Sequence, residues 1–118
     1  MNIEEIRQYC LAKKGVTEGL PFGPDTLVFK VMNKMFALMA LEATPVSVNL
    51  KCDPELALEL RAQYPAVKPG YHMNKQHWNT VSADGSFSDL QLREWVDNSY
   101  ELIVASLKKA DKETLKNL

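Results

Sequence analysis

The sequence predicts an α+β fold, a two-layer domain in which helices pack on one antiparallel sheet. The predicted elements run in the order helix, three strands, helix, two short strands, helix, so strands follow one another without alternating with helices. Such runs of adjacent strands favour an antiparallel sheet with helices packed on it. The chain has 118 residues and neither repeats nor a linker, which suits one domain, residues 1–118, with a real core.

The composition excludes several classes of protein. The chain is 46% hydrophobic and 25% charged, as is typical of a soluble globular domain. Its formal net charge of −1 argues against a strong non-specific nucleic-acid binder but allows a local basic patch. No apolar run approaches the roughly 20 residues of a membrane span, and the acidic, amphipathic start differs from a secretory signal. We therefore expect a cytoplasmic protein with no membrane contact.

The first predicted element is a helix that begins after Asn2, with Glu5 placed three residues on as in a capping box. Four residues fall on one helical face: Ile3, Ile6, Tyr9 and Cys10. Gly15 is expected to end this helix. Residues 17–26 contain two prolines and two glycines and are expected to form a loop.

A hairpin and a third strand are predicted between residues 26 and 52. In the first strand, Leu27, Phe29 and Val31 alternate with residues that point the other way, and the turn is expected at Asn33-Lys34. The third strand alternates cleanly. One face carries Val46, Val48 and Leu50, and the other carries Ser47, Asn49 and Lys51. The second face is therefore expected to be wet or bound to something.

The most clearly predicted helix spans residues 53–64, with Asp53 as its cap and Pro54 in the first helical position. Its inward stripe is expected to comprise Leu56, Ala57, Leu60 and Tyr64. Pro69-Gly70 then predicts a turn, followed by a short extended piece at 71–73 and a strand near 77–82. A last helix is predicted from Ser88, with Gln91 completing a capping box, to about Leu107. Residues 108–118 read as a charged, solvated tail with at most one more helical turn.

No catalytic or metal-binding constellation is recognised. His72 and His77 are five residues apart across a predicted turn, and a metal would need a third ligand. Cys10 and Cys52 lie far apart with no CxxC, so we expect two free thiols and no zinc site or disulfide. Cys52 precedes a helix N-terminus, which can activate a thiol, although a lone cysteine there is usually inert. We therefore expect a non-enzymatic protein without metal or cofactor.

Binding is the better-supported class of function. The chain offers cations, aromatic rings and amides of the kinds that meet phosphates and bases: Lys30, Lys51, Lys75, His72, His77, Trp78 and Asn79. Several of them lie on predicted strands or at strand ends and are able to share one side of the sheet. The alternative interpretation is a solvated surface, in which lysines only keep a strand soluble and Trp78 belongs to the core.

The sequence also resembles a known family over about residues 3 to 108. The segments that carry the resemblance are Pro21-Phe22-Gly23, Phe29-Lys30-Val31, Leu50-Lys51, Pro69-Gly70-Tyr71-His72-Met73, His77-Trp78-Asn79 and Ser99-Tyr100. In this order and spacing they resemble the MmcQ/YjbR family of small bacterial proteins. The resemblance implies a two-layer α+β fold like that of secretion chaperones.

The same resemblance implies a predicted DNA-binding module with a double-wing arrangement, a description that rests on fold similarity to a phage transcription factor domain. It implies no agreed enzyme activity or cofactor. Carried over position by position, the family motif places these residues in the candidate site: Phe22, Gly23, Lys30, Lys51, Gly70, Tyr71, His72, Lys75, His77, Trp78 and Asn79.

Three functional hypotheses follow. The first is a DNA-binding or regulatory module that uses the lysine-bearing sheet face with the 70–79 loop. The second is a module for a protein partner or small ligand, with a groove between the sheet and the PFG and PGYHM loops, residues 21–23 and 69–73. The third is an enzyme in which His72 or His77 acts as acid or base. A continuous positive stripe favours the first, and an apolar cleft at Phe22, Tyr71 and Trp78 favours the second.

Overall fold

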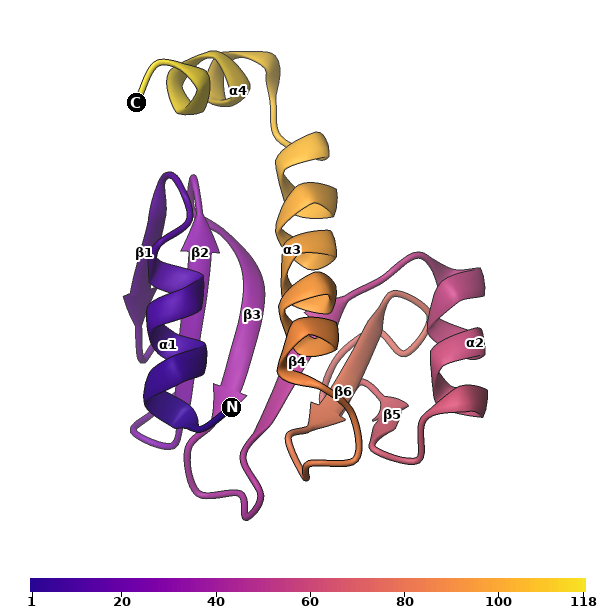
Figure 1. The fold of residues 1–118 in the computed structure, drawn as a ribbon. Helices are drawn as coiled ribbons and strands as arrows, with labels where there is room; N and C mark the ends of the chain where they lie inside the picture. The colour runs from indigo at the N-terminus through magenta and orange to yellow at the C-terminus, as the bar shows by residue number, and fades with distance from the viewer.

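One antiparallel sheet of six strands organises the chain, and the computed structural model describes all of residues 1–118. In spatial order the sheet runs β1-β2-β3-β4-β6-β5. Its strands are β1 (Val16–Gly19), β2 (Thr26–Val31), β3 (Lys34–Ala40), β4 (Ser47–Lys51), β5 (Val67–Pro69) and β6 (Trp78–Ser82). The helices are α1 (Ile3–Leu11), α2 (Pro54–Gln63), α3 (Asp89–Ala105) and α4 (Lys109–Lys116) (Figure 1). The predicted α+β class is confirmed.

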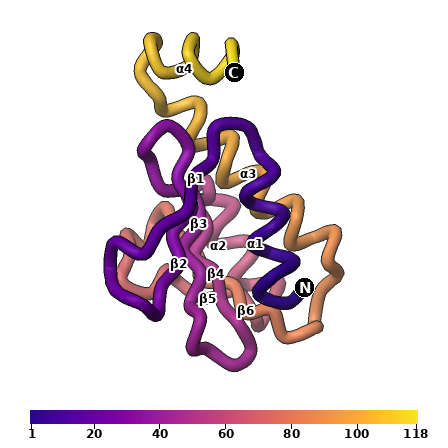
Figure 2. Tube along the Cα trace, turned by 90° about the vertical axis from the view of Figure 1, so that its left-hand side faces the viewer, coloured from indigo at the N-terminus to yellow at the C-terminus, as the bar shows by residue number.

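Two layers result from this arrangement, because α1 and α3 cover one face of the sheet and leave the other face without a helix (Figure 2). The main core fills the space between sheet and helices. From the strands it takes Phe29, Val31, Phe36, Met39, Val48 and Leu50, and from the helices Ile6, Cys10, Leu92, Trp95, Val96 and Ile103. The shorter α2 lies at the side of β5 and β6 (Figure 1). We call the helix-free side the open face.

The predicted helix starts are confirmed by their caps. Asn2 and Glu5 form the reciprocal capping box of α1, and the Asp53 carboxylate accepts from the first backbone N–H groups of α2. The Ser88 hydroxyl accepts from the Gln91 backbone N–H at the start of α3, but the predicted capping box is not completed, because the Gln91 side chain donates to Glu94. α1 ends at Leu11, earlier than Gly15.

Residues 16–19 form a strand where the sequence predicts a loop beginning at residue 17. This strand, β1, pairs with β2 from Val16 opposite Val31 to Gly19 opposite Val28. Strand pairing therefore overrides the turn signals at this point, and the prolines remain in the loop of residues 20–25.

The hairpin turn also lies one residue earlier than predicted. Its two central residues are Met32 (φ 48°) and Asn33 (φ 69°), and Lys34 already begins β3. Positive φ at both positions is the geometry of the tight turn that matches the twist of a hairpin. The register shifts between Phe29 and Lys30, so the consecutive residues Phe36 and Ala37 are both buried in the core.

The short extended piece predicted at 71–73 is wrong, because the strand lies at Val67–Pro69. Val67 pairs with Val81 and is buried, whereas residues after Gly70 turn back, with the Met73 N–H donating to the Gly70 carbonyl over 3.2 Å. The apolar pairing at Val67 explains why β5 begins so early.

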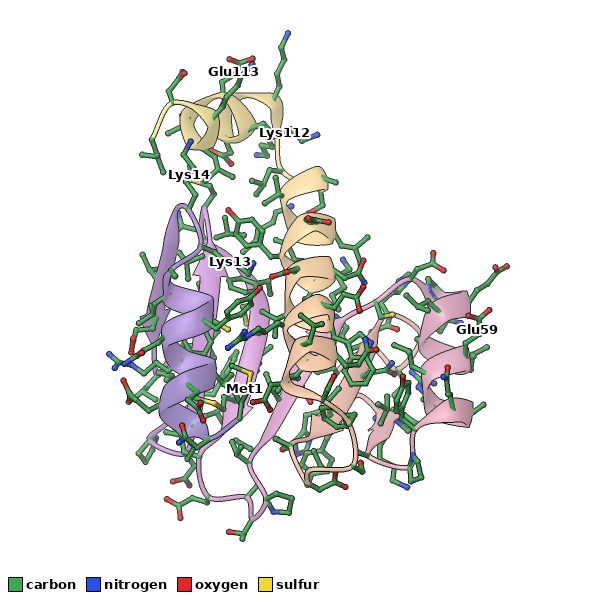
Figure 3. The ribbon with its side chains drawn as sticks, in the orientation of Figure 1. Met1, Lys13, Lys14, Glu59, Lys112 and Glu113 are labelled. Carbon is green, nitrogen blue, oxygen red and sulfur yellow. The ribbon has the colours of Figure 1, made fainter.

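The C-terminal tail is more structured than the single turn predicted. It forms α4, and Leu115 on this helix is buried against Gly15. A Cβ atom at Gly15 would come within 2.5 Å of the Leu115 side chain, so this glycine makes room for α4. Lys14 donates to the Lys116 carbonyl over 3.0 Å, and Figure 3 shows Lys14 reaching towards α4.

A polar cluster joins α1 to α3. The Tyr9 hydroxyl donates to the Asp97 carboxylate over 2.6 Å, and the Lys13 ammonium pairs with the same carboxylate between the two helices (Figure 3). Burial and this hydrogen bond together raise the pKa of Tyr9 to about 12. No helix of the chain combines the length and the apolar character that crossing a membrane requires.

Candidate functional site

A groove of about 690 Å³ lies on the open face of the sheet. Its apolar lining residues are Phe22, Met35, Leu38, Ala40, Tyr71 and Met73, and its polar ones are Thr26, Ser47, Asn49, His72 and Thr80. This volume falls within the roughly 300–1,000 Å³ of pockets that hold small molecules. The lining contains no Asp, Glu, Lys or Arg.

The strand alternation creates the floor of this groove. The predicted faces of β4 are confirmed, since Val48 and Leu50 join the main core whereas Ser47 and Asn49 line the groove. Beneath and beside the groove lies a second apolar cluster of Val28, Leu38 and Trp78, against which Met35 and Met73 pack. Trp78 is 9% exposed, so its ring supports the groove from within the protein.

The two walls of the groove come from the motif loops. Phe22 in the loop of residues 20–25 is 64% exposed, and Tyr71 in the loop of residues 70–77 is 69% exposed. Both loops project on the side of the sheet away from α1 and α3 (Figure 2). Large apolar side chains gathered at the surface over an apolar floor make this face a candidate binding surface.

Hydrogen bonds fasten the second loop to the sheet. The Tyr71 backbone N–H donates to the Thr80 hydroxyl over 2.9 Å, and the Asn49 amide donates to the Tyr71 carbonyl over 3.1 Å. The Thr80 hydroxyl in turn donates to the Asn49 side-chain oxygen. The main polar groups of the groove therefore satisfy one another, and they fix the position of Tyr71.

The conformation of the same loop depends on two residues of the motif. The Gly70 N–H donates to the Trp78 carbonyl over 2.8 Å, and a Cβ atom at Gly70 would lie only 2.8 Å from the Trp78 Cβ. His72 follows in the left-handed region with φ 60°, and its ring lies 4.0 Å from that of Tyr71, centroid to centroid. Gly70 is thus required by close packing.

The groove continues past Phe22 and Met35 into a second, more open hollow of about 610 Å³, which we call the lysine depression. Lys30, Lys34 and Lys51 line it, and its lining contains no acidic residue. Lys34 donates to the Ser106 carbonyl over 3.1 Å, whereas none of the three lysines takes part in the four ion pairs of the protein. Positive charge therefore collects at one end of an otherwise uncharged groove.

The remaining predicted site residues lie apart from the groove lining. Lys75 is exposed, and its ammonium donates to the Gly70 carbonyl over 3.0 Å. His77 is half-buried, and its carbonyl accepts from the Cys52 N–H over 2.8 Å. Asn79 is 2% exposed, with its side chain accepting from Arg61 over 2.7 Å. Pro21 lines the lysine depression, Pro69 ends β5, and Gly23 adopts φ 111° in its loop.

The two hollows are also lined by residues that the sequence does not predict as site residues: Met35, Leu38, Met73 and Lys34. The available signal was the alternation of the first hairpin, whose second strand places Leu38 opposite Val28 on the open face. Asn49 was assigned to this face but not given a role.

The histidines and cysteines of the chain lie in different surroundings. His72 is exposed and His77 is half-buried, and no three His, Cys, Asp or Glu side chains are grouped to hold a metal ion. Burial raises the pKa of the Cys10 thiol to about 12. Burial, with a smaller contribution from Asp53, also raises the pKa of Cys52, so its place before α2 does not activate it.

Comparison with known proteins places the chain in a family. The YjbR family model matches residues 11–102. An Escherichia coli K12 protein, "Uncharacterized protein YjbR", is 38% identical over 118 residues, which cover 100% of both chains. The chain belongs to the YjbR family. Its resemblance to MmcQ/YjbR proteins is thereby confirmed.

Other relatives support the same conclusion for this YjbR-family protein. "Uncharacterized protein YbdF" of Escherichia coli O157:H7 is 41% identical over 97 residues, 81% of this chain and 79% of that protein. The crystal structure of Deinococcus radiodurans protein DR2400 superposes with a TM-score of 0.91 at 36% identity and covers 98% of this chain and 88% of that one. A Pseudomonas syringae crystal structure gives a TM-score of 0.76 at 28% identity, covering 86% and 98%. The two-layer fold is thus shared with solved relatives of the YjbR-family protein.

Proposed function

We propose that this YjbR-family protein binds a small, mainly apolar molecule in the groove on the open face. The observation that carries the proposal is the placement of Phe22 and Tyr71. These two exposed rings come from separate motif loops and line the same cavity above Leu38. An apolar cleft at Phe22, Tyr71 and Trp78 is the feature expected of a ligand site; Phe22 and Tyr71 line the groove, whereas Trp78 is buried and does not.

The energetics favour an apolar occupant. Covering the exposed parts of two aromatic rings removes roughly 200 Å² of apolar surface from water, worth about 5 kcal/mol before the cost of association. The polar side chains Asn49 and Thr80 already bond to each other and to Tyr71, so they leave few free groups for a strongly polar ligand. A concave site of this volume suits a small molecule better than a flat protein surface.

Titration with decanol tests the proposal by ¹⁵N–¹H NMR of the intact protein. We expect saturable shift changes concentrated at the amides of Phe22, Leu38 and residues 71–73. Ser47 lines the groove, so Ser47→Phe fills it with a ring and should weaken binding at least tenfold. Thr17→Phe on β1 is the matched control, because Thr17 is an exposed strand residue outside the groove. Shift changes scattered away from the groove, or equal binding by the two variants, would contradict the proposal.

DNA binding is the second candidate, and the lysine depression is the observation that favours it. Lys30, Lys34 and Lys51 form a patch without acidic neighbours, and lysines of this kind contact phosphates. Lys75 lies apart from this lining, with its ammonium on the Gly70 carbonyl. The net charge of −1 and the apolar groove beside the patch make this candidate weaker than the first.

Fluorescence anisotropy with a labelled duplex tests the DNA candidate. Binding should fall steeply between 50 and 200 mM salt (about 10³-fold for six or more phosphate contacts). Lys30→Glu, Lys34→Glu and Lys51→Glu, which reverse the charges of the lysine depression, should each weaken it. Wild-type protein that fails to bind at low salt would exclude this candidate.

A further inference from the structure

We infer that the ligand of the groove is an amphipathic organic anion, with its apolar body on the groove floor and its anionic head group in the lysine depression. The inference rests on the proposed function and specifies the chemical class of the ligand. Its basis is the separation of apolar surface and positive charge along one continuous hollow. The head group is a carboxylate or a phosphate, since both pair with ammonium groups.

The groove and the lysine depression adjoin each other. Phe22 and Met35 each line both the groove and the lysine depression. A molecule that lies against these two side chains therefore reaches the floor around Leu38 in one direction and the lysines in the other. The groove lining contains no Asp, Glu, Lys or Arg before the lysines are reached.

Two lysines of the depression have no partner in the protein. Lys30 on β2 and Lys51 on β4 project to the open face and are half-buried, and their ammonium groups have no ion-pair or hydrogen-bond partner in the protein. Arg7 and Lys13, by contrast, pair with Glu18 and Asp97. Two unpaired cations beside apolar surface attract an anion more strongly than cations in open solvent, because the local dielectric constant is lower.

Lys34 is the third cation of the depression and differs from the other two. Its ammonium holds the Ser106 carbonyl after the last turn of α3, which positions the charge at the rim. The backbone of α3 thereby closes one side of the depression, together with Ile103. The depression thus has three cations and an apolar side, and no acidic residue in its lining balances the positive charge.

Comparison of decanoate, decyl phosphate and decanol tests this inference. These probes share an alkyl chain and differ in the head group, so their NMR titrations separate the apolar contribution from the ionic one. We expect both anions, or one of them, to bind at least tenfold more tightly than decanol at 50 mM salt. Raising the salt to 500 mM should remove most of that difference and leave decanol unchanged. The anion with the higher affinity identifies the head group.

Lysine variants locate the head group. Lys30→Gln and Lys51→Gln should each weaken the anions by roughly three- to tenfold and leave decanol unchanged. Lys112→Gln is the matched control, because Lys112 is exposed on α4 and lines neither hollow (Figure 3). If Lys112→Gln weakens anion binding equally, the effect comes from the net charge of the protein and not from the lysine depression, and the inference is overturned.

The failures of the two proposals are distinguishable. If decanol and both anions bind the groove equally and the lysine variants change nothing, the anionic ligand is wrong while the apolar site stands. If none of the three probes binds and Ser47→Phe therefore has no effect to measure, the proposed function fails and this inference fails with it.

Discussion

The side-chain amide of Asn49 donates to the backbone carbonyl of Tyr71 over 3.1 Å, across the border between the sheet and the second motif loop. Asn49 lies in the middle of β4, and Tyr71 is the most exposed aromatic residue of the groove. A polar strand residue that points to the open face thus sets the position of a side chain 22 residues away. The strand face that is predicted to be wet or bound to something thus partly serves to hold the loop of residues 70–77, through Asn49.

The substitution Asn49→Asp should loosen this loop selectively. Aspartate keeps the oxygen that accepts from Thr80 but loses the donor to Tyr71 and places a carboxylate near its carbonyl. We expect a loss of about 1 kcal/mol in the free energy of unfolding and faster hydrogen exchange at residues 71–73. Asn117→Asp, at an exposed position in the C-terminal turn, is the control. Unchanged exchange in the loop would show that other contacts hold it.

Gly70→Ala should destabilise the protein by packing alone. The Cβ atom would lie 2.8 Å from the Trp78 Cβ and 2.9 Å from the Trp78 carbonyl oxygen, so the loop or strand β6 must shift. The expected cost is about 1–3 kcal/mol in the free energy of unfolding, measured by urea denaturation. Gly19→Ala is the matched control, because nothing lies within 4 Å of a Cβ atom there, and it should be close to neutral. A Gly70→Ala variant as stable as Gly19→Ala would refute the role of close packing.

The sequence was sufficient for the fold class because its strongest patterns are local. The caps at Asn2 and Asp53 and the alternation of Val46, Val48 and Leu50 depend on residues close in the chain, and the structure has them as predicted. The errors fall where a distant partner decides. Residues 16–19 become a strand only because β2 offers an edge, and Leu115 becomes helical where it packs against Gly15.

The candidate site shows the same division. Phe22, Tyr71 and His72 were selected from the motif and do share the groove. Asn79 was selected by the same motif, yet it points to the helix side because β6 alternates from Trp78 onward. The sequence of a single strand does not reveal which of its faces a helix covers. Predicting that Asn79 is on the covered face and Trp78 on the open face therefore requires knowing where α2 lies.

Arg61→Met should be more destabilising than its place on a small peripheral helix implies. The Arg61 guanidinium donates to the buried Asn79 side chain over 2.7 Å, to the Trp78 carbonyl over 3.2 Å and to the Lys75 carbonyl, which ties α2 to the motif. Methionine keeps the apolar stem but leaves the buried Asn79 side-chain oxygen without a donor, whereas the Trp78 carbonyl still accepts from the Gly70 N–H. We expect a loss of about 2–3 kcal/mol in the free energy of unfolding.

Arg93→Met provides the comparison for that measurement. Arg93 is exposed on α3, and its guanidinium lies 5.5 Å from the Tyr9 ring. Such a contact is worth about 0.5–1 kcal/mol at an exposed site. Urea denaturation of both variants should therefore separate them by more than 1 kcal/mol. Equal losses would mean that Arg61 contributes only its packing.

The buried thiol of Cys10 should make the protein less stable at alkaline pH. Burial raises its pKa from 9.0 to about 12, so above pH 9 the unfolded chain releases the thiol proton while the folded chain keeps it. The unfolded state then binds fewer protons than the folded state, and the free energy of unfolding falls as the pH rises. The stabilisation is complete below pH 9 and is lost progressively up to about pH 12.

Cys10→Ala should flatten this decline. At pH 10 the wild type should have lost on the order of 1 kcal/mol through this thiol, a loss that alanine cannot show. The variant is less stable than wild type at pH 7, because Cys10 is fully buried, but its urea midpoint should change less between pH 8 and pH 10. Ile6→Val, another core truncation on α1, should keep the wild-type slope. Parallel pH profiles for wild type and Cys10→Ala would assign the alkaline loss to other groups, with Cys52 the first to examine because burial also raises the pKa of its thiol.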